Sequence, residues 1–195
     1  KRAARFGGDI LPFDTARGAD SGLRIEEGWV SYRHKTEGGR LFPVTDLKLH
    51  GKFNLENAMA AAGAAVLEGC SPTAIRRAAQ SFSGLPHRLQ TVGKWREVSV
   101  YNDSKSTNPA STLRAVEVMP SPLLVIVGGS DKNLELSELA RELCARVKAV
   151  ICYGEVGNRI FRALAETRDT GTAPLISWDK PFTKAVGRAL SMAAP

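Results

Sequence analysis

The sequence predicts an α/β fold with a mostly parallel sheet in its second half, preceded by a β-rich and then helical first half. Two observations lead to this class. In the second half, short apolar runs alternate with helical patterns, as they do in βαβ units. In the first half, alternation of apolar and polar residues gives way to an Ala-rich helical segment.

The first fifty residues are expected to form mostly strands. Residues 10–13 are a short apolar run, and residues 23–33 alternate around Glu27-Gly28, a plausible hairpin turn. Residues 41–49 form a further extended stretch.

Two helices are expected next. Residues 54–67 are Ala-rich and helical, and Gly69 should stop that helix. Ser71 then provides an N-cap and Pro72 the first helical position of a helix that runs to about Phe82.

A domain boundary is predicted where this second helix ends. Residues 83–86 read SGLP, and Gly and Pro there break the helix. The chain is therefore expected to divide into residues 1–84 and residues 85–195.

The second domain is expected to alternate strands and helices. Strands are predicted at 98–101, 123–127, 149–153 and 174–178, and helices at 109–118, 135–147, 157–167 and 181–193. The continuous apolar run LLVIV at 123–127 indicates a strand buried on both faces. Ligands of parallel sheets bind at the carboxyl ends of the strands. The polar segments after the first two strands are therefore the first candidates for a site.

Composition and charge limit the classes of function. The net charge of +7 over 195 residues favours anionic partners. Lys and Arg are scattered, without a basic block or interleaved aromatics, so no nucleic-acid partner is expected. No apolar run is long enough to span a bilayer, so no membrane insertion is expected.

The cysteines argue against a metal site. Cys70, Cys144 and Cys152 are far apart, form no metal-type pair and are accompanied by only three histidines. They are expected to be buried thiols in a reducing compartment, which indicates a cytoplasmic protein.

The first polar segment, YNDSKSTNP, holds more chemistry than a turn requires. Asn108 can cap the following helix, which leaves Asp103, Lys105 and Thr107 in excess. Lys105, the Thr107 hydroxyl and free helix amides could hold a carboxylate or phosphate. Asp103 could accept hydrogen bonds from ribose hydroxyls. The alternative is a solvated loop with an Asx-turn.

Three further segments carry candidates, each with a structural alternative. In VIVGGSDKN, Lys132 follows two glycines, as it would also in a plain strand-to-helix turn. In GKFNLENA, Asn54 and Asn57 share a helix face and could read a purine edge, or serve as an N-cap and a solvent-facing amide. In GLPHRLQ, Arg88 could bind a phosphate or form an interdomain salt bridge, and His87 could simply be packed at the seam.

These residues together predict a positively lined cleft that binds a nucleotide and a small anion. No Ser-His-Asp or Cys-His nucleophile arrangement is present, so no catalytic residue is assigned within this chain.

Taken in order, the four segments resemble motifs of the Mur ligases of peptidoglycan synthesis. That family carries G-x-H-N-x-x-N, then L-P-H-R, then N-D-S-K-A-T-N after a strand, then a G-G-x-x-K turn. The matching segments here lie between Gly51 and Lys132. The third motif separates the members that add D-glutamate from relatives with a histidine- or tyrosine-containing segment there. One departure is Phe53, which stands where the motif has histidine.

The resemblance implies an organisation and an activity. Residues 1–84 would be the C-terminal part of a central ATP-binding domain, and residues 85–195 an incomplete Rossmann-like ligase domain. The whole enzyme would be an ATP-dependent, ADP-forming amide-bond ligase that adds D-glutamate to UDP-N-acetylmuramoyl-L-alanine through an acyl phosphate. It would act as a monomer with Mg²⁺, whose ligands are expected outside this chain, and the chain alone is expected to be inactive.

The resemblance also implies roles for the candidate residues. ATP would be bound by Asn54, Asn57, Arg88 and Asp103, and D-glutamate by Lys105, Thr107 and Lys132, with His87 as a further site residue. Two alternatives stay open: a non-catalytic nucleotide- or anion-binding module, and a Mur or folylpolyglutamate-type ligase with a different amino-acid substrate.

Overall fold

The computed structural model describes residues 9–14, 21–49, 51–167 and 174–193. The chain divides between Gly84 and Leu85 into two compact units, unit 1 (Lys1–Gly84) and unit 2 (Leu85–Pro195). The division falls within the helix-breaking SGLP sequence. The assignment of the units to an ATP-binding domain and a ligase domain stays a prediction.

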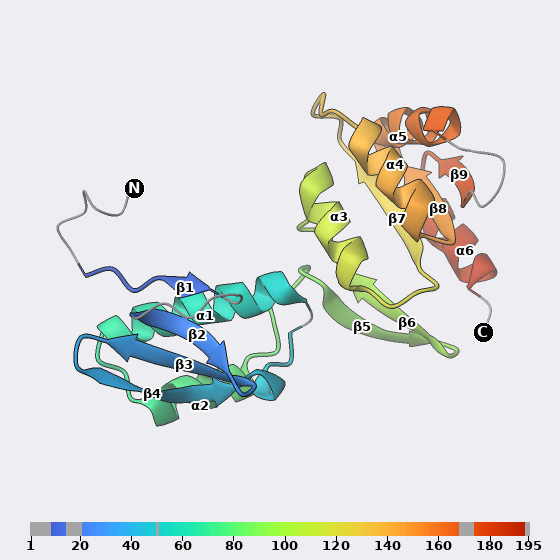
Figure 1. The fold of residues 1–195 in the computed structure, drawn as a ribbon. Coiled ribbons are helices and arrows are strands. Elements are labelled where there is room, and N and C mark those ends of the chain that lie inside the picture. Colours follow the sequence, from blue (N-terminus) through green and yellow to red (C-terminus); the bar gives the residue numbers. More distant parts are fainter. Residues whose placement is uncertain (1–8, 15–20, 50, 168–173, 194–195) are drawn as a thin grey trace. The chain divides into compact units, whose positions relative to one another are not determined.

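The described residues of unit 1 form a four-stranded sheet with two α-helices packed on it (Figure 1). Its elements are β1 (Phe13–Asp14), β2 (Gly22–Glu26), β3 (Trp29–His34), β4 (Glu37–Pro43), the short 3₁₀ helix η2 (Val44–Asp46), α1 (Lys52–Leu67) and α2 (Pro72–Ser81). The predicted hairpin is confirmed, because β2 and β3 are antiparallel and joined at Glu27 and Gly28. Both turn residues have positive φ, as a type I′ turn requires.

The helix boundaries of unit 1 follow from local signals. Gly69 has φ of 77°, and the Cys70 amide donates to the carbonyl of Ala65 at 2.9 Å, which closes α1 in a Schellman motif. Ser71 caps α2 by accepting from the Ala74 amide at 3.3 Å. Both predictions are confirmed. The core of the unit joins the two helices to the sheet through Leu23, Val30, Leu41, Phe42, Met59, Ala62 and Ile75.

The part of unit 2 that the structure describes contains a two-stranded hairpin, a three-stranded parallel sheet and four helices (Figure 1). Its elements are β5 (Gln90–Trp95), β6 (Val98–Asn102), α3 (Pro109–Val118), β7 (Leu124–Gly129), α4 (Ser137–Arg146), β8 (Ala149–Tyr153), α5 (Gly154–Thr167), β9 (Leu175–Asp179) and α6 (Phe182–Met192). β7, β8 and β9 pair in parallel and in sequence order, so the predicted α/β class with a parallel sheet is confirmed.

The first predicted strand of that sheet was wrongly placed. β6 pairs with β5 in an antiparallel hairpin, in a sheet separate from β7–β9. β5 was missed altogether. Its sequence, QTVGKW, has no apolar alternation because all six residues are exposed, and a strand without a buried face carries no period-2 signal.

The prediction that LLVIV is buried on both faces was also wrong. β7 lies at an edge of the three-stranded sheet, and all its residues are only half-buried. The central strand, β8, is the buried one. Val150 and Cys152 pack in the core with α4 and α5, whereas Ile151 alternates with them and points to the opposite face of the sheet.

The cysteines differ in exposure. Cys152 is fully buried and Cys144 is half-buried, but Cys70 is exposed, so the expectation of three buried thiols is wrong for Cys70. Within the described ranges, no helix is long and apolar enough to cross a membrane.

Glycine is required where β7 ends against β8. A Cβ on Gly128 would overlap the carbonyl oxygen of Tyr153, whereas a Cβ on Gly129 would meet no atom within 4 Å. We expect Gly128→Ala to destabilise the chain more than Gly129→Ala by about 1–3 kcal/mol, the usual cost of overpacking. Native-state amide exchange of β8 measures this difference. Equal effects of the two substitutions would show that backbone strain alone matters there.

Burial of the Cys152 thiol makes the free energy of unfolding depend on pH in the alkaline range. Burial raises the pKa of Cys152 to about 12, above the ordinary value near 8.5 of an unfolded thiol. The folded state favours the protonated thiol. Its contribution to the free energy of unfolding is therefore complete below about pH 8.5 and is lost as pH rises toward about 12. In urea unfolding, the stability gap between the protein and Cys152→Ala should narrow from about pH 7 to about pH 10.5. Cys70→Ala is the matched control with no such trend, and a constant gap for Cys152→Ala would refute the effect.

Candidate functional site

The loop of residues 102–108 leads from β6 into α3. Its last residue, Asn108, accepts from the Ser111 amide through Oδ1 at 2.9 Å, and Pro109 follows at the first helical position. The predicted cap is therefore confirmed. At the start of the loop, Asn102 Oδ1 accepts from the Ser104 amide at 3.0 Å, so the Asx-turn alternative also holds for part of the loop.

Asp103 fixes this loop to the segment before β5. Its Oδ1 accepts from the Leu89 amide at 2.9 Å, and its Oδ2 accepts from the Ser106 hydroxyl at 2.5 Å. The carboxylate is half-buried. Each carboxylate oxygen can accept two hydrogen bonds, so both retain capacity for a ligand hydroxyl.

The LPHR segment is bonded to the same loop along its backbone. The Lys105 amide donates to the carbonyl of His87 at 3.0 Å, and the Asn102 amide group lies 3.0 Å from His87 Nδ1. His87 and Leu89 have φ of 65° and 45°, a strained conformation that these contacts stabilise. His87 therefore connects the LPHR segment to the loop of residues 102–108. The LPHR segment and the loop of residues 102–108 thus form one hydrogen-bonded assembly, which carries Arg88, Asp103 and Lys105.

The cationic side chains of this assembly are available to a ligand. Arg88 and Lys105 are exposed, and neither forms a salt bridge with any residue in the part of the chain that the structure describes. Thr107 is exposed in the same loop.

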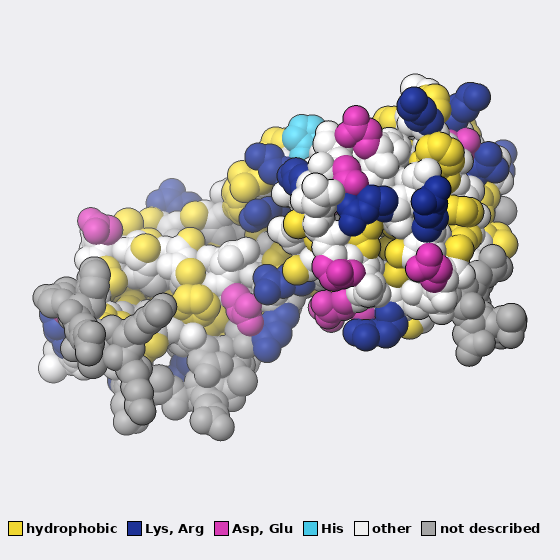
Figure 2. Space-filling view, turned by 90° about the horizontal axis from the view of Figure 1, so that it is seen from above, with side chains coloured by type: hydrophobic (Ala, Val, Ile, Leu, Met, Phe, Trp, Pro, Cys, Tyr) yellow, Lys and Arg dark blue, Asp and Glu magenta, His cyan; other side chains and the backbone are white. Residues whose placement is uncertain are grey.

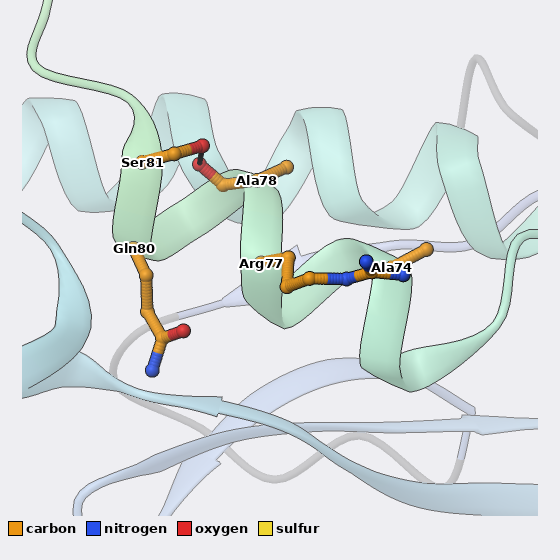
Figure 3. Close-up of a pocket in the computed structure, with 5 residues that line it drawn as sticks. All are labelled: Ala74, Arg77, Ala78, Gln80 and Ser81. Carbon is orange, nitrogen blue, oxygen red and sulfur yellow. Dashed lines mark hydrogen bonds between the residues drawn. The ribbon is translucent and has the colours of Figure 1, made fainter.

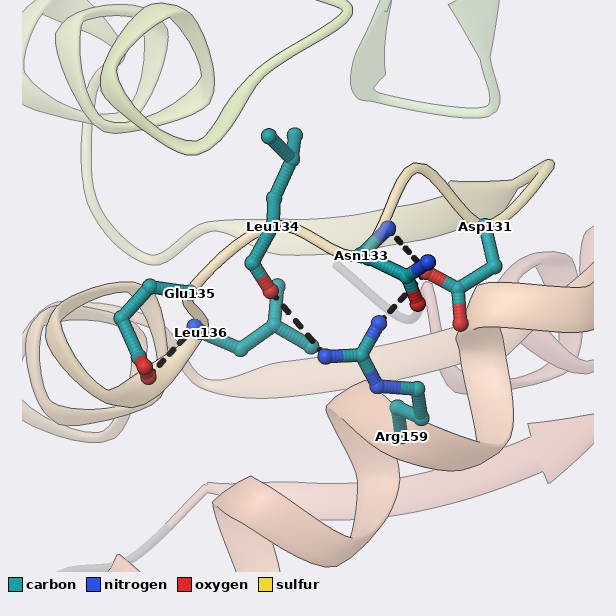
Figure 4. A network of polar contacts seen from close by, with 6 residues as sticks. All are labelled: Asp131, Asn133, Leu134, Glu135, Leu136 and Arg159. Carbon is teal, nitrogen blue, oxygen red and sulfur yellow. Dashed lines mark hydrogen bonds and ion pairs between the residues drawn. The ribbon is translucent and has the colours of Figure 1, made fainter.

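Lys132 lies on a second loop, between β7 and α4. It is exposed and stands between Asp131 and Asn133, whose amide donates to Asp131 Oδ1 at 2.8 Å. Arg159 of α5 also donates to Asp131, and to the carbonyl of Leu134 (Figure 4).

α4 is capped from outside its own first turn. The residue at its N-cap position, Leu136, cannot accept a hydrogen bond through its side chain. Glu135 instead accepts from the Ser137 hydroxyl at 2.8 Å and from the amides of Leu136 and Ser137. The hydrogen bonds from Ser137, then that from Leu136, hold the pKa of Glu135 below its ordinary value.

Asp131, Glu135 and Arg159 were missed by the sequence analysis, although an acidic residue before a helix is a known capping signal.

Asn54 and Asn57 lie on α1 of unit 1. The N-cap of α1 is Gly51, so the suggestion that Asn54 caps this helix is wrong. Asn54 is 7% exposed, whereas Asn57 is exposed. Of the two amides, that of Asn57 is therefore the one presented at the surface of the unit.

The hollow on the surface of α2 holds none of the predicted residues. A shallow hollow on α2 is lined by Ala74, Arg77, Ala78, Gln80 and Ser81, without a carboxylate or histidine (Figure 3). On the face of unit 2 seen in Figure 2, Lys and Arg are interspersed with Asp and Glu. Among the described residues, no three His, Cys, Asp or Glu side chains gather as a metal site would require.

The fold recurs in solved ligases. MurF from Acinetobacter baumannii superposes with a TM-score of 0.65 at 18% identity, over 94% of this chain and 40% of that structure. Folylpolyglutamate synthase from Mycobacterium tuberculosis, in complex with ADP and AMPPCP, gives a TM-score of 0.65 at 18% identity, over 89% of this chain and 41% of that structure. At these identities the similarity shows the shared fold.

Sequence comparison identifies the family. The chain is 34% identical to UDP-N-acetylmuramoylalanine--D-glutamate ligase of Limosilactobacillus reuteri, over 91% of the chain and 40% of that protein. It is 35% identical to the protein of the same name from Acidobacterium capsulatum, over 91% of the chain and 38% of that protein. The chain thus spans about two fifths of these relatives. Residues 87–195 match the family described as "Mur ligase, glutamate ligase domain". The chain therefore belongs to the Mur ligase family.

Proposed function

We propose that the full-length protein is an ATP-dependent ligase that joins D-glutamate to UDP-N-acetylmuramoyl-L-alanine in the cytoplasm, as a monomer. The observation that carries this proposal is the bonded assembly of the LPHR segment and the loop of residues 102–108. It presents a carboxylate and two cations that have no salt-bridge partner within the described ranges. The names of the relatives at 34% and 35% identity support the same substrate.

The nucleotide would be bound by groups of different chemistry. Asp103 accepts from the ribose hydroxyls through the lone pairs that Leu89 and Ser106 leave available. The guanidinium of Arg88 forms paired hydrogen bonds with phosphate oxygens. Asn57 donates to and accepts from the adenine edge, with Asn54 nearby on the same helix.

The amino acid would be bound by two cations and a hydroxyl. Lys105, Thr107 and Lys132 hold the carboxylates of D-glutamate through charge-assisted hydrogen bonds. The γ-phosphoryl group of ATP passes to the carboxylate of the acceptor and ADP is released. The amine of D-glutamate then attacks the acyl carbon, and inorganic phosphate departs from a tetrahedral intermediate with the C–O bonding pair. The contribution of this chain is positioning and neutralisation of charge.

Magnesium is not assigned to this chain. Magnesium in such enzymes is held by one or two carboxylates together with water and substrate phosphates. The Mg²⁺ ligands of the proposed enzyme would come from elsewhere in the full-length protein.

A second candidate keeps the ligase chemistry but changes the amino acid. The same fold occurs in a folylpolyglutamate synthase and in MurF. The exposed lysines at positions 105 and 132 would suit any amino-acid carboxylate, so the choice of substrate must be measured.

The first test is phosphate release by the full-length protein with ATP and UDP-N-acetylmuramoyl-L-alanine. We expect release with D-glutamate and none with L-glutamate, L-alanine or L-lysine, because the relatives at 34% and 35% identity are named for D-glutamate. Release with another amino acid would support the second candidate. Absence of release with every amino acid and acceptor would point to a non-catalytic binding module.

The second test separates the two ligand sites. Lys105→Ala and Lys132→Ala should each raise the KM for D-glutamate by roughly tenfold to a hundredfold, since each removes a charge-assisted hydrogen bond of about 1.5–3 kcal/mol. The KM for ATP should change little. Lys94→Ala, in the exposed β5 strand, is the control. Equal changes in both KM values would disprove the assignment of these lysines to the amino acid.

A further inference from the structure

The loop that carries Lys132 is held in place by one side chain from another element. We propose that Arg159 is a positioning residue that sets the location of Lys132 for the amino-acid substrate, an inference that rests on the proposed function. Arg159 lies in α5, which follows β8, whereas Lys132 follows β7.

The contacts of Arg159 lie on both sides of Lys132. Its Nη1 donates to Asp131 Oδ1 at 2.5 Å, and its Nη2 donates to the carbonyl of Leu134 at 3.1 Å. Figure 4 shows the guanidinium reaching from α5 to both points of the loop. The planar guanidinium therefore connects the Asp131 carboxylate to the Leu134 carbonyl, with Lys132 and Asn133 between them.

The start of this loop is fixed by the sheet. Gly128 pairs with Tyr153 of β8, and a bridge joins Gly129 to Gly154, so the part that needs a further contact lies between Gly129 and α4. Asn133 is itself in the left-handed region with φ of 52°. The local bond from the Asn133 amide to Asp131 shapes the turn, but it does not connect the turn to the rest of the unit.

The far end of the loop is already anchored by Glu135 at the start of α4. Arg159 supplies the anchor at the near end, through Asp131. It also adds to the charge environment of Glu135, where its positive charge makes a minor contribution to the lowered pKa of that carboxyl, after the hydrogen bonds from Ser137 and Leu136.

The position of Lys132 depends on its backbone, because no salt bridge within the described ranges fixes its side chain. It is exposed, and no salt bridge to it occurs within the described ranges. The position of the ammonium group therefore depends on how firmly the backbone of Lys132 is held. Since the Arg159–Asp131 pair is partly exposed, with side chains 42% and 27% accessible, we expect it to contribute little to global stability.

The test uses the full-length enzyme with Arg159→Met, Arg159→Lys and, as matched control, Arg162→Met, three residues later on α5 and also exposed. Arg159→Met should raise the KM for D-glutamate about tenfold, with the KM for ATP and the Tm unchanged. Arg159→Lys should recover part of the loss, because it keeps the charge but not the two-point geometry. Arg162→Met should behave as the unmodified enzyme.

A second variant tests the route of the effect. Asp131→Asn keeps an oxygen that can accept from the Asn133 amide but removes the charge that Arg159 contacts. It should raise the KM for D-glutamate as Arg159→Met does, and the double variant should be no worse than either, because the residues act as one unit. Additive effects, or equal effects on both KM values, would overturn the proposal.

Amide hydrogen exchange gives a readout that does not require activity. The Asn133 amide should exchange faster in Arg159→Met than in Arg162→Met. Unchanged exchange in Arg159→Met would overturn the positioning role whether or not the enzyme uses D-glutamate. A different outcome separates the two proposals. If exchange is faster in Arg159→Met but the unmodified enzyme releases no phosphate with D-glutamate, the proposed substrate is rejected and the contact of Arg159 with the loop still stands.

Discussion

The backbone pairing of β8 determines where the functional loops of unit 2 begin. Its first four residues are buried, so its peptide groups must find partners in β7 and β9. The register with β7 brings Gly128 against Tyr153, and a bridge between Gly129 and Gly154 continues it. The loop with Lys132 and the first turn of α5 therefore start from the same edge of the sheet, which brings Arg159 within reach of Asp131.

The two loops of the candidate site in unit 2 are stabilised in different ways. The loop of residues 102–108 is defined by its own side chains and by the neighbouring LPHR segment, through Asp103, Asn102 and the cap at Asn108. The loop that carries Lys132 depends on α5, an element distant in sequence. In both, polar groups that fix the backbone are satisfied within the protein, and the exposed cations are left for a ligand. Such preorganisation reduces the entropy lost on binding.

Membership of the Mur ligase family gives this arrangement a chemical context. The proposed reaction through an acyl phosphate would require several anionic groups to be bound at once, and fixed cations and hydrogen-bond donors are the means by which proteins bind anions. The net charge of +7 is consistent with that need. On the visible face of unit 2 the charges are mixed in sign (Figure 2).

The sequence by itself determined the features that depend on neighbouring residues: the α/β class, the Glu27-Gly28 hairpin, the Gly69 stop and the caps at Ser71 and Asn108. It also brought out the motifs that identify the family. Only the tertiary structure decided which strand is central, that β6 pairs with β5, that Asn54 is buried and that Cys70 is exposed. It alone revealed the contacts of Arg159. Caps and turns involve residues a few positions apart, whereas burial and strand order depend on contacts between segments that no local pattern records.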